Sequence, residues 1–478
     1  MDSSVKQNTE FRQAITRLDA TALVVGTMIG SGIFLVSADI LRQVHTPGVM
    51  LLVWALSGVI TLMGALSYGE LAAMFPKAGG QYVYLRESIS PLFGYLYGWT
   101  LFAVIQTGTI AAVAVAFAKF TAIFFPGLSP DVWFGVTVNL GSGPIAVGVS
   151  PQRVLAIISI FALTLINIRG VRAGALIQTA LTGVKTLSLA ALVILGLLIG
   201  RNAAAIAANF GPNFWGTQGL TLALLPIIGS AMVGSLFSMD SWNNVGFAGS
   251  ELKNPKKDLP LAMALGTLTV TVLYLLANVS YLVTLPSGAI AHAPQDRVGT
   301  AALQAMFGEP GLYLMAAAIM ISTFGCNNGL ILSGARVFYA MAKDKLFFAS
   351  AGKLNPTYQT PRFALVIQAV WASVLCLSGT YNELLTYVIA AQLLFYALTA
   401  LGLFMLRKNR PDAERPVRAP GYPWIPGLYL LSTLVLCVDL LFTQTKYAGI
   451  GLIIVALGVP VYFLSKGSGA GGQISGTA

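Results

Sequence analysis

The chain is 478 residues long, with 56 % hydrophobic residues and only 9 % charged ones. Soluble domains carry about 25 % charged residues, so the composition excludes a soluble enzyme or binding module. The net charge of +11 would suit a nucleic-acid ligand, but the basic residues alternate with long apolar runs. We therefore expect a protein that contacts the lipid bilayer, and no nucleic-acid partner.

Apolar runs recur along the whole chain, and about twelve of them approach the roughly 20 residues needed to cross a bilayer. We expect an all-α polytopic membrane protein with spans near 18–40, 49–74, 91–121, 153–168, 175–199, 222–247, 259–284, 310–342, 363–379, 384–406, 424–443 and 448–464. The first twenty residues are polar, so no cleavable signal is expected.

Small residues interrupt the first apolar run. Gly26 and Gly30, four positions apart, could simply let two helix backbones approach each other. Gly30, Ser31 and Gly32 together do more, because they weaken the helix and offer adjacent backbone N–H groups where a second half-helix would start. The sequence therefore predicts a broken first span.

A broken span can bind both charges of a zwitterion. The start of the second half-helix favours a carboxylate, while carbonyls released near Thr27 and Met28 can accept from an ammonium group. An α-amino acid presents both groups. These residues are therefore candidate substrate ligands.

Lys185 lies alone inside the fifth apolar run, far from either end. A cation at mid-membrane costs roughly 2.5 to 3.5 kcal/mol on insertion scales, so such a residue normally faces an internal cavity and works there. The alternative is a lysine that extends its ammonium to the headgroups, and the distance to the span ends argues against it.

The sixth apolar run carries a second set of weak helix formers, among them Ser238 and Asp240. We predict a break there too, with carbonyls around Phe237 completing the ammonium site. Because the breaks are five spans apart, a second repeat would enter the membrane from the opposite side, as in many secondary transporters. The expected division is a cytoplasmic N-terminal segment 1–17, a first repeat 18–200, a second repeat 222–406, two additional spans in 424–464 and a cytoplasmic tail 465–478.

Asp240 is the second charge that we expect within the membrane. It could attract a cationic substrate, pair with a basic group, or cap a half-helix, since aspartate is a preferred N-cap. The sequence leaves these alternatives open.

The loops predict the topology. Most Lys and Arg residues fall on one side, which satisfies the positive-inside rule with both termini cytoplasmic in a multi-pass cell-membrane protein. The basic cluster 407–418 is interpreted as a topology determinant rather than a lipid-headgroup patch. The three cysteines lie in predicted spans and the two histidines lie far apart, so no disulfide framework, metal, cofactor or enzymatic activity is expected.

Four runs of sequence, 26–34, 75–87, 251–260 and 415–423, resemble one family. The chain is similar to the amino acid–polyamine–organocation transporters and, within them, to the L-type amino acid transporters and their bacterial relatives. The resemblance implies a five-plus-five inverted-repeat transporter fold with broken helices one and six. It also implies transport of amino acids by alternating access.

The resemblance implies roles for individual residues. Ser31 and Gly32 would bind the substrate carboxylate through backbone N–H groups, with Gly30 giving the room. Phe237 would close over the substrate from outside, and Trp242 matches the tryptophan that follows the sixth-span break. Ordinary packing is the alternative for both aromatic residues.

Lys185 acquires a specific role from the same resemblance. In sodium-independent members a lysine of span five lies beneath the broken first helix, where sodium-coupled relatives hold an ion. Its ammonium would donate to backbone carbonyls of that break. A permanently charged lysine implies an exchanger or facilitator, whereas one that loses its proton during the cycle implies proton coupling.

Met28, Ser238 and Asn328 are expected to shape the pocket for the substrate side chain. The expected function is sodium-independent exchange of neutral L-amino acids. Asp240 keeps open a carrier of cationic amino acids or polyamines, and a receptor or channel is the alternative of another class. Animal L-type members are disulfide-linked to a glycoprotein through the loop between spans three and four, but loop 124–152 has no cysteine, so no such heavy subunit is expected.

Overall fold

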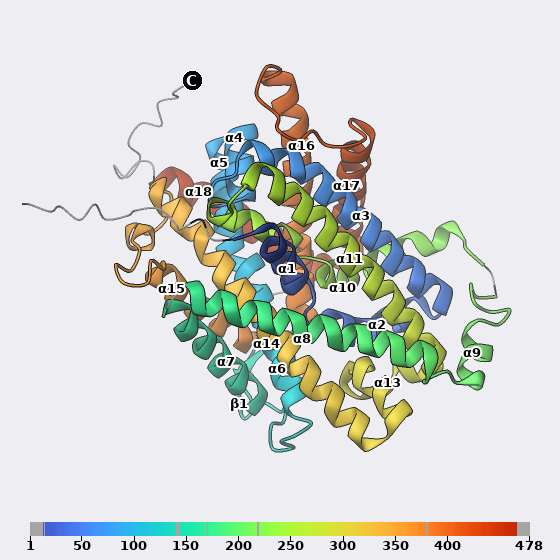
Figure 1. The fold of residues 1–478 in the computed structure, drawn as a ribbon. Coiled ribbons are helices and arrows are strands. Elements are labelled where there is room, and N and C mark those ends of the chain that lie inside the picture. The colour runs from blue at the N-terminus through green and yellow to red at the C-terminus, as the bar shows by residue number, and fades with distance from the viewer. Residues whose placement is uncertain are drawn as a thin grey trace, which may run out of the picture.

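The computed structural model describes residues 13, 15–139, 144–169, 171–217, 219–378 and 381–465, without the side chains of 137–139, 144–146, 171–179, 382–383, 446–447 and 465. It is a bundle of helices in which α8 (Val171–Leu198) and α14 (Glu309–Lys343) cross in the foreground of Figure 1. Most of the expected N-terminal segment 1–17, and nearly all of the expected tail 465–478, lie outside the described residues.

The first half of the chain forms nine helices and a π-helical turn. These are α1 (Arg17–Met28), α2 (Gly32–Val44), α3 (Pro47–Met74), α4 (Gln81–Ser88), α5 (Pro91–Thr100), η1 (Leu101–Ile105), α6 (Gln106–Thr121), α7 (Pro151–Ile168), α8 (Val171–Leu198) and α9 (Ala203–Asn209). Proline opens three of them, at Pro47, Pro91 and Pro151. The first helical position suits proline, because no N–H is needed there.

The second half adds nine helices joined by short 3-10 segments. These are η2 (Leu222–Leu224), α10 (Leu225–Ser238), η3 (Trp242–Glu251), α11 (Pro255–Thr284), α12 (Ser287–Ala291), η4 (Pro294–Asp296), α13 (Val298–Phe307), α14 (Glu309–Lys343), η5 (Ala349–Gly352), α15 (Arg362–Ser378), α16 (Tyr381–Asn409), α17 (Trp424–Thr443) and α18 (Thr445–Ser465).

The membrane-spanning helices follow the apolar runs closely. In the part of the chain that the structure describes, nine segments are long and apolar enough to cross a membrane, and α1 with α2, bent by 41°, make a tenth. α15 and the segment Ala448–Leu464 of α18 are apolar but shorter. The protein is therefore a multi-span membrane protein, and the two shorter helices account for the difference from the twelve spans expected.

The expectation of an all-α chain is wrong in one segment. Between α6 and α7, strands β1 (Phe134–Asn139) and β2 (Pro144–Val149) pair antiparallel, with Phe134 opposite Val149. Both strands are rich in valine and other β-branched residues, which fit a pleated surface better than a helix. The hairpin therefore reflects local propensity in a segment too short and too polar to span.

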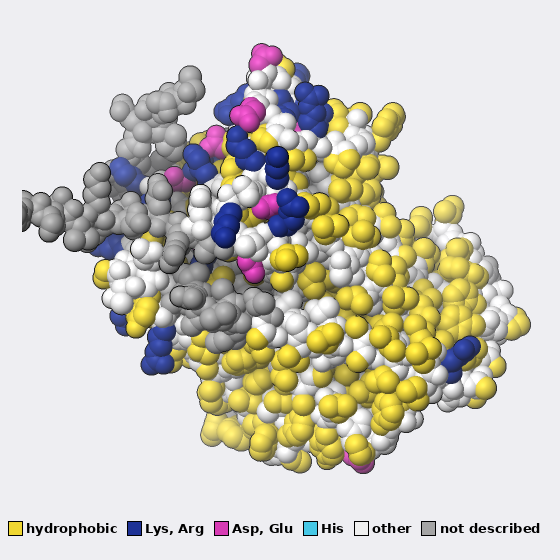
Figure 2. All heavy atoms as spheres, viewed as in Figure 1, with side chains coloured by type: hydrophobic (Ala, Val, Ile, Leu, Met, Phe, Trp, Pro, Cys, Tyr) yellow, Lys and Arg dark blue, Asp and Glu magenta, His cyan; other side chains and the backbone are white. Residues whose placement is uncertain are grey.

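The outer surface separates apolar from charged residues (Figure 2). Helix α11 exposes four apolar side chains at helical spacing, namely Leu261, Leu265, Leu268 and Val272. Leu187 of α8 is exposed as well. Figure 2 shows apolar side chains over this broad face, and Lys and Arg gathered at the end of the bundle where α16 ends. An apolar face of this size suits lipid contact.

A buried carboxylate ties this basic end together. Glu70 of α3 is fully buried and accepts from Arg407 (Nη2–Oε2 2.5 Å), Arg415 (Nε–Oε1 3.2 Å) and the backbone N–H of Ala419 (2.7 Å). Two members of the basic cluster thus join α3 to the end of α16 and to the segment before α17. The interpretation of the cluster as a topology determinant alone misses this structural role.

The start of the chain pairs with the segment that follows η3. Ile15 donates its N–H to the carbonyl of Glu251 (2.9 Å) and accepts from the N–H of Lys253 (3.0 Å), which makes a parallel β-bridge. Arg17 Nε also lies 2.8 Å from Asp258 Oδ1. Backbone and side chain therefore fasten the beginning of α1 to the beginning of α11.

Candidate functional site

The first span is broken where the sequence predicts. α1 ends at Met28 and α2 begins at Gly32, with Ser31 as its N-cap residue. Ser31 and Gly32 are buried, and the side chain of Ser31 makes no capping hydrogen bond. Because the first N–H groups of a helix have no partner within it, the start of α2 presents donors to the break.

The carbonyls released by the break are contacted by neighbouring helices. Met28 O accepts from Tyr274 Oη of α11 (2.9 Å), and Thr27 O accepts from Cys326 Sγ of α14 (3.1 Å). A carbonyl oxygen has two lone pairs, so each can accept a second donor. The carbonyls near Thr27 and Met28 thus accept from protein donors of α11 and α14, and their contact with a substrate ammonium stays a prediction.

The sixth span is broken as well. α10 ends at Ser238, Ser241 adopts a left-handed conformation (φ 69°), and the chain continues as the 3-10 segment η3 from Trp242 rather than as a second α-helix. The unusual backbone at Ser241 redirects the chain between the two halves. The predicted break is therefore confirmed.

The two breaks touch each other. Thr27 Oγ1 donates to the carbonyl of Ser241 (3.1 Å), and a methyl group added at Gly32 would overlap the side chain of Ser238. A direct hydrogen bond thus joins the broken regions of spans one and six. This closeness brings the donors of α2 and the carbonyls of both breaks into one region.

Lys185 points into the protein. Its side chain is fully buried, and Nζ of Lys185 donates to the carbonyl oxygen of Gly26 in α1. The prediction that the ammonium contacts the broken first helix is confirmed, and the headgroup alternative is wrong. The last turn of α1 is thereby held by a cation from α8.

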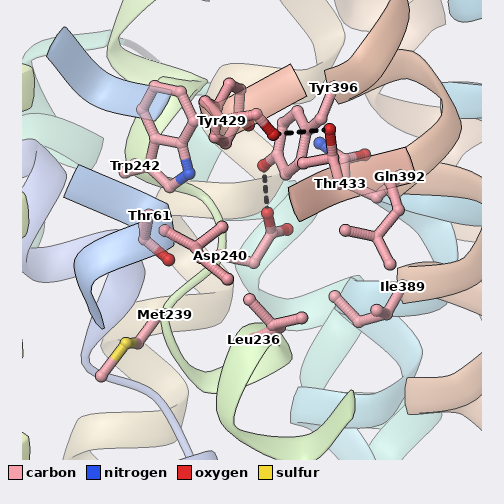
Figure 3. Close-up of a pocket in the computed structure, with 12 residues that line it drawn as sticks. Thr61, Leu236, Met239, Asp240, Trp242, Ile389, Gln392, Tyr396, Tyr429 and Thr433 are labelled. Atoms are coloured by element: carbon pink, nitrogen blue, oxygen red, sulfur yellow. Dashed lines mark hydrogen bonds between the residues drawn. The ribbon is translucent and has the colours of Figure 1, made fainter. Parts of the chain in front are cut away.

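Asp240 lies in a pocket beside the second break (Figure 3). Its carboxylate accepts from the hydroxyl of Tyr396, and the ion pairs found among the described residues do not include Asp240. The pocket lies between α3, α10, α16 and α17, and its lining includes Thr61, Trp242, Gln392, Tyr396, Tyr429 and Thr433. None of the described lining residues comes from the first break.

The predicted aromatic residues lie on different sides of the second break. The Trp242 ring meets the rings of Tyr68 (4.8 Å between centroids) and Tyr396 (5.7 Å). Phe237 is buried and packs edge-to-face against Tyr381 (6.2 Å, 81°). Trp242 thus belongs to the Asp240 pocket, whereas Phe237 faces the start of α16.

Asn328 contacts a residue of α7. Its Oδ1 accepts from Asn167 Nδ2 of α7 (2.8 Å), which places it on the α7 side of α14. Cys326, two positions earlier, instead meets the first break. Two positions along an α-helix correspond to a rotation of about 200°, so the side chains of Cys326 and Asn328 point to opposite sides of α14.

Sequence analysis missed the tyrosines that surround the breaks. Tyr274 comes from α11, and Tyr381 and Tyr396 come from α16. Each hydroxyl contacts a break residue. Their spacing carries no signal, because these spans are apolar on every face and the sequence does not show which face turns inward.

Further charges within span helices were also missed. Arg336 of α14 is buried and pairs with Glu251 (3.0 Å), while Glu70 is buried in α3. Asp439 of α17 packs its carboxylate against Gly229. These charges were missed because a single charge near the end of a long apolar run hardly changes the mean hydropathy of a window. Asp240 is therefore one of several charges in the span helices and not the second of two.

Comparison with known proteins gives a consistent result. The amino acid permease family model matches residues 15–462. The serine/threonine exchanger SteT of Bacillus subtilis is 31 % identical over 460 residues, covering 95 % of this chain and 97 % of that protein. The b(0,+)-type amino acid transporter 1 of Mus musculus is 29 % identical over 468 residues (97 % and 90 %), and the large neutral amino acids transporter small subunit 2 of Homo sapiens is 30 % identical over 463 residues (95 % and 80 %).

These matches extend over nearly the whole chain and agree with the resemblance to the amino acid–polyamine–organocation transporters. The chain belongs to the amino acid permease family.

Proposed function

We propose that this permease exchanges neutral L-amino acids across the cell membrane by alternating access and without sodium. The contact between the two helix breaks carries the proposal, because it gathers N–H donors and carbonyl acceptors into one buried region. The relatives named above are an exchanger of serine and threonine, a transporter of amino acids and a subunit of a transporter of large neutral amino acids. Their names support an amino acid as the substrate.

The substrate carboxylate would bind the backbone N–H groups of Ser31 and Gly32. A helix N-terminus stabilises an anion through its free donors and its dipole. Gly30 leaves room, since a side chain there would press on Cys326 Sγ at 3.0 Å. The ammonium group would lie among the carbonyls near Thr27, Met28 and Phe237.

Lys185 would serve as a fixed cation in place of a bound one. The contact with Gly26 O is a charge-assisted hydrogen bond to the half-helix that must move during transport. A cation that the chain itself supplies needs no sodium gradient. Exchange is then driven by the substrates on the two sides.

The remaining architecture follows the family. We place twelve spans as two inverted repeats, 18–200 and 222–406, followed by two additional spans in 424–464, with both termini cytoplasmic. The loop 124–152 carries no cysteine, so we propose that no disulfide-linked subunit is needed.

A second candidate is transport of cationic amino acids. Asp240 favours it, because its carboxylate lies in a pocket surrounded by the rings of Trp242, Tyr396 and Tyr429. An anion among aromatic faces is a suitable environment for an ammonium or guanidinium group. The two candidates differ in the side chain that the carrier accepts and share the same backbone site.

Reconstitution in liposomes tests both candidates. Uptake of radiolabelled alanine, serine, leucine, arginine and putrescine would be measured in sodium-free buffer, with and without unlabelled amino acid inside. We expect uptake of neutral substrates that requires internal amino acid and does not change when sodium is added. Uptake of arginine or putrescine alone would favour the second candidate, and no uptake of any compound would contradict both.

A further inference from the structure

The hairpin between α6 and α7 exposes large apolar side chains. Phe134 and Val136 of β1 are 77 % and 69 % exposed, and Trp133, directly before the strand, is 62 % exposed. The segment 122–152 carries a single charged residue, Asp131, and no Lys or Arg. Exposed apolar side chains that lie together mark a surface that contacts a partner.

The two faces of the hairpin differ. Alternate residues of a strand point to the same face, so Phe134 and Val136 share one face. On the other face the paired residues Gly135 and Gly148 have no side chains, and Cγ1 of Val132 lies against both of them. The chain itself therefore covers the glycine face and leaves the face of Phe134 and Val136 open.

The register of the strands keeps the open face close to the spans. Phe134 pairs with Val149, just before α7 begins at Pro151. At about 3.4 Å per residue, Phe134 therefore lies about 7 Å from the start of α7. The headgroup layer extends roughly 5 to 7 Å beyond the hydrocarbon on each side of a bilayer. The distance of the open face from the span thus matches the thickness of this layer.

An apolar strip of α7 leads to the hairpin. This helix exposes four apolar side chains at helical spacing, namely Val154, Ile158, Phe161 and Leu165. Such a strip on a membrane-spanning helix faces lipid. Figure 1 shows β1 at the end of α7, at the opposite end of the bundle from the end of α16, where the basic side chains gather. The apolar surface of the span therefore continues to the base of the hairpin.

Hydrogen bonds hold the base of the hairpin on the spans. Arg153 Nη1 donates to the carbonyls of Gly148 (2.7 Å) and Leu377 (3.1 Å), which ties β2 to the end of α15. Gln152 Nε2 donates to the carbonyl of Leu128 (3.0 Å), which ties the segment before β1 to the start of α7. Both ends of the hairpin are thereby fastened at the ends of α7 and α15.

We propose that this hairpin lies in the phospholipid headgroup layer, with Phe134 and Val136 against the acyl chains and Trp133 at the boundary with water. Tryptophan gathers at this depth because its ring is apolar and its N–H is polar. Lipid is the partner rather than a second copy of the chain, because the open face continues the lipid-facing strip of α7. The absence of Lys and Arg means that the contact does not depend on anionic lipid.

The fluorescence of Trp133 tests the proposal without reference to transport. It is measured as the difference between the wild type and Trp133→Phe, each as a single copy in phosphatidylcholine nanodiscs. Lipid brominated high in the acyl chain should quench this emission at least roughly twofold more than lipid brominated near the chain end, and aqueous iodide should quench it weakly. Quenching by iodide alone would overturn the proposal. Protection from all three quenchers would overturn it as well, because it would indicate a protein contact.

Trp371 provides a matched reference for depth. It is a partly exposed tryptophan near the middle of α15. Its emission, obtained with Trp371→Phe, should show the opposite order, with lipid brominated near the chain end as the stronger quencher.

Phe134→Asp tests the open face directly. A carboxylate is poorly solvated among acyl chains, so the hairpin should leave the lipid, and quenching of Trp133 by brominated lipid should fall at least roughly twofold. Gly127→Asp is the matched control, because position 127 is exposed in the same loop and a side chain there would meet no atom within 4 Å. It should leave the quenching unchanged. Thermal melting checks that both variants are folded, and a folded Phe134→Asp with the quenching of the wild type would overturn the proposal.

Discussion

Lys185 shows how one buried charge can stabilise a helix end at a break. The ammonium contacts Gly26 O, which lies in the last turn of α1 and therefore among the last carbonyls of that half-helix. A cation at a helix C-terminus is favourable because it opposes the negative end of the helix dipole. The lysine thus stabilises the end of α1 at the break, in addition to the role of fixed cation proposed for it.

Lys185→Met should separate these effects from simple packing. Methionine keeps the length and apolar stem but removes the charge, and a hydrogen bond to a charged group contributes about 1.5 to 3 kcal/mol. We expect exchange in liposomes to fall more than tenfold, with the protein still folded by thermal melting. Lys256→Met is the control, because Lys256 is half exposed and pairs only with the exposed Glu414 among the described residues.

Lys256→Met should transport like the wild type. If Lys185→Met also transports at the wild-type rate, the ammonium is not required for the cycle.

The depth of Lys185 in its apolar run was enough to predict that its side chain points into the protein. The direction of Asn328 could not be predicted, because its neighbours in sequence are polar on two faces of α14.

At the scale of the elements, the two breaks depend on the absence of side chains where they meet. Gly32 begins α2 directly against Ser238, which ends α10. Neither helix could approach the other so closely with a larger residue at position 32. The small residues therefore set the distance between the half-helices as well as their flexibility.

Gly32→Ala should push the breaks apart. The added methyl would overlap Ser238, and overpacking of a tight core typically costs about 1 to 3 kcal/mol. We expect a lower melting temperature and a loss of exchange of at least tenfold. Gly183→Ala on α8 is the control, because its methyl would meet no atom within 4 Å.

A second variant checks the cause. Ser238→Gly removes the side-chain atoms that the new methyl overlaps, so adding it to Gly32→Ala should recover part of the lost stability. Failure of this rescue would show that Gly32 is needed for another reason. Both breaks could be predicted from the sequence, because weak helix formers act locally. The hairpin of β1 and β2 was not predicted, because the apolar runs were judged by their length and the valines that alternate in this loop were not considered.

For the whole molecule, a buried charge cluster attaches the segment before α17 to α3. Glu70 of α3 receives Arg407, Arg415 and the N–H of Ala419, and so connects the first half of the chain to the segment before α17. Breaking a buried ion pair by removing one partner leaves the other charge uncompensated. The cluster is therefore a sensitive point of the assembled bundle.

Glu70→Gln should lower the stability of the folded protein. The expected loss is about 3 to 5 kcal/mol, since both arginines would remain without their carboxylate. Thermal melting of the purified protein measures it. Glu414→Gln is the matched control, because the Glu414 side chain is 77 % exposed in its pair with Lys256, and exposed pairs contribute little. Equal melting temperatures for the two variants would contradict a structural role for Glu70.

The architecture was more predictable than its internal contacts. Apolar length predicted the spans, since it depends on bilayer thickness and little else. The partner of Glu70 could not be predicted, because Arg407 and Arg415 lie more than 300 positions later in the chain. From the sequence, their basic run was interpreted as a topology determinant, and only the fold shows the Glu70 carboxylate beside it.

The bridge between Ile15 and the chain after η3 is made by the backbone alone. Ile15 N–H and the N–H of Lys253 are its donors, and no side chain takes part in either bond. Substitution by any residue that keeps its amide hydrogen leaves the bridge intact. Homologous chains can therefore carry different side chains at positions 15 and 253 and keep the same two hydrogen bonds. A comparison of residue identities does not reveal this contact. Proline at either position would break it, because proline has no amide hydrogen.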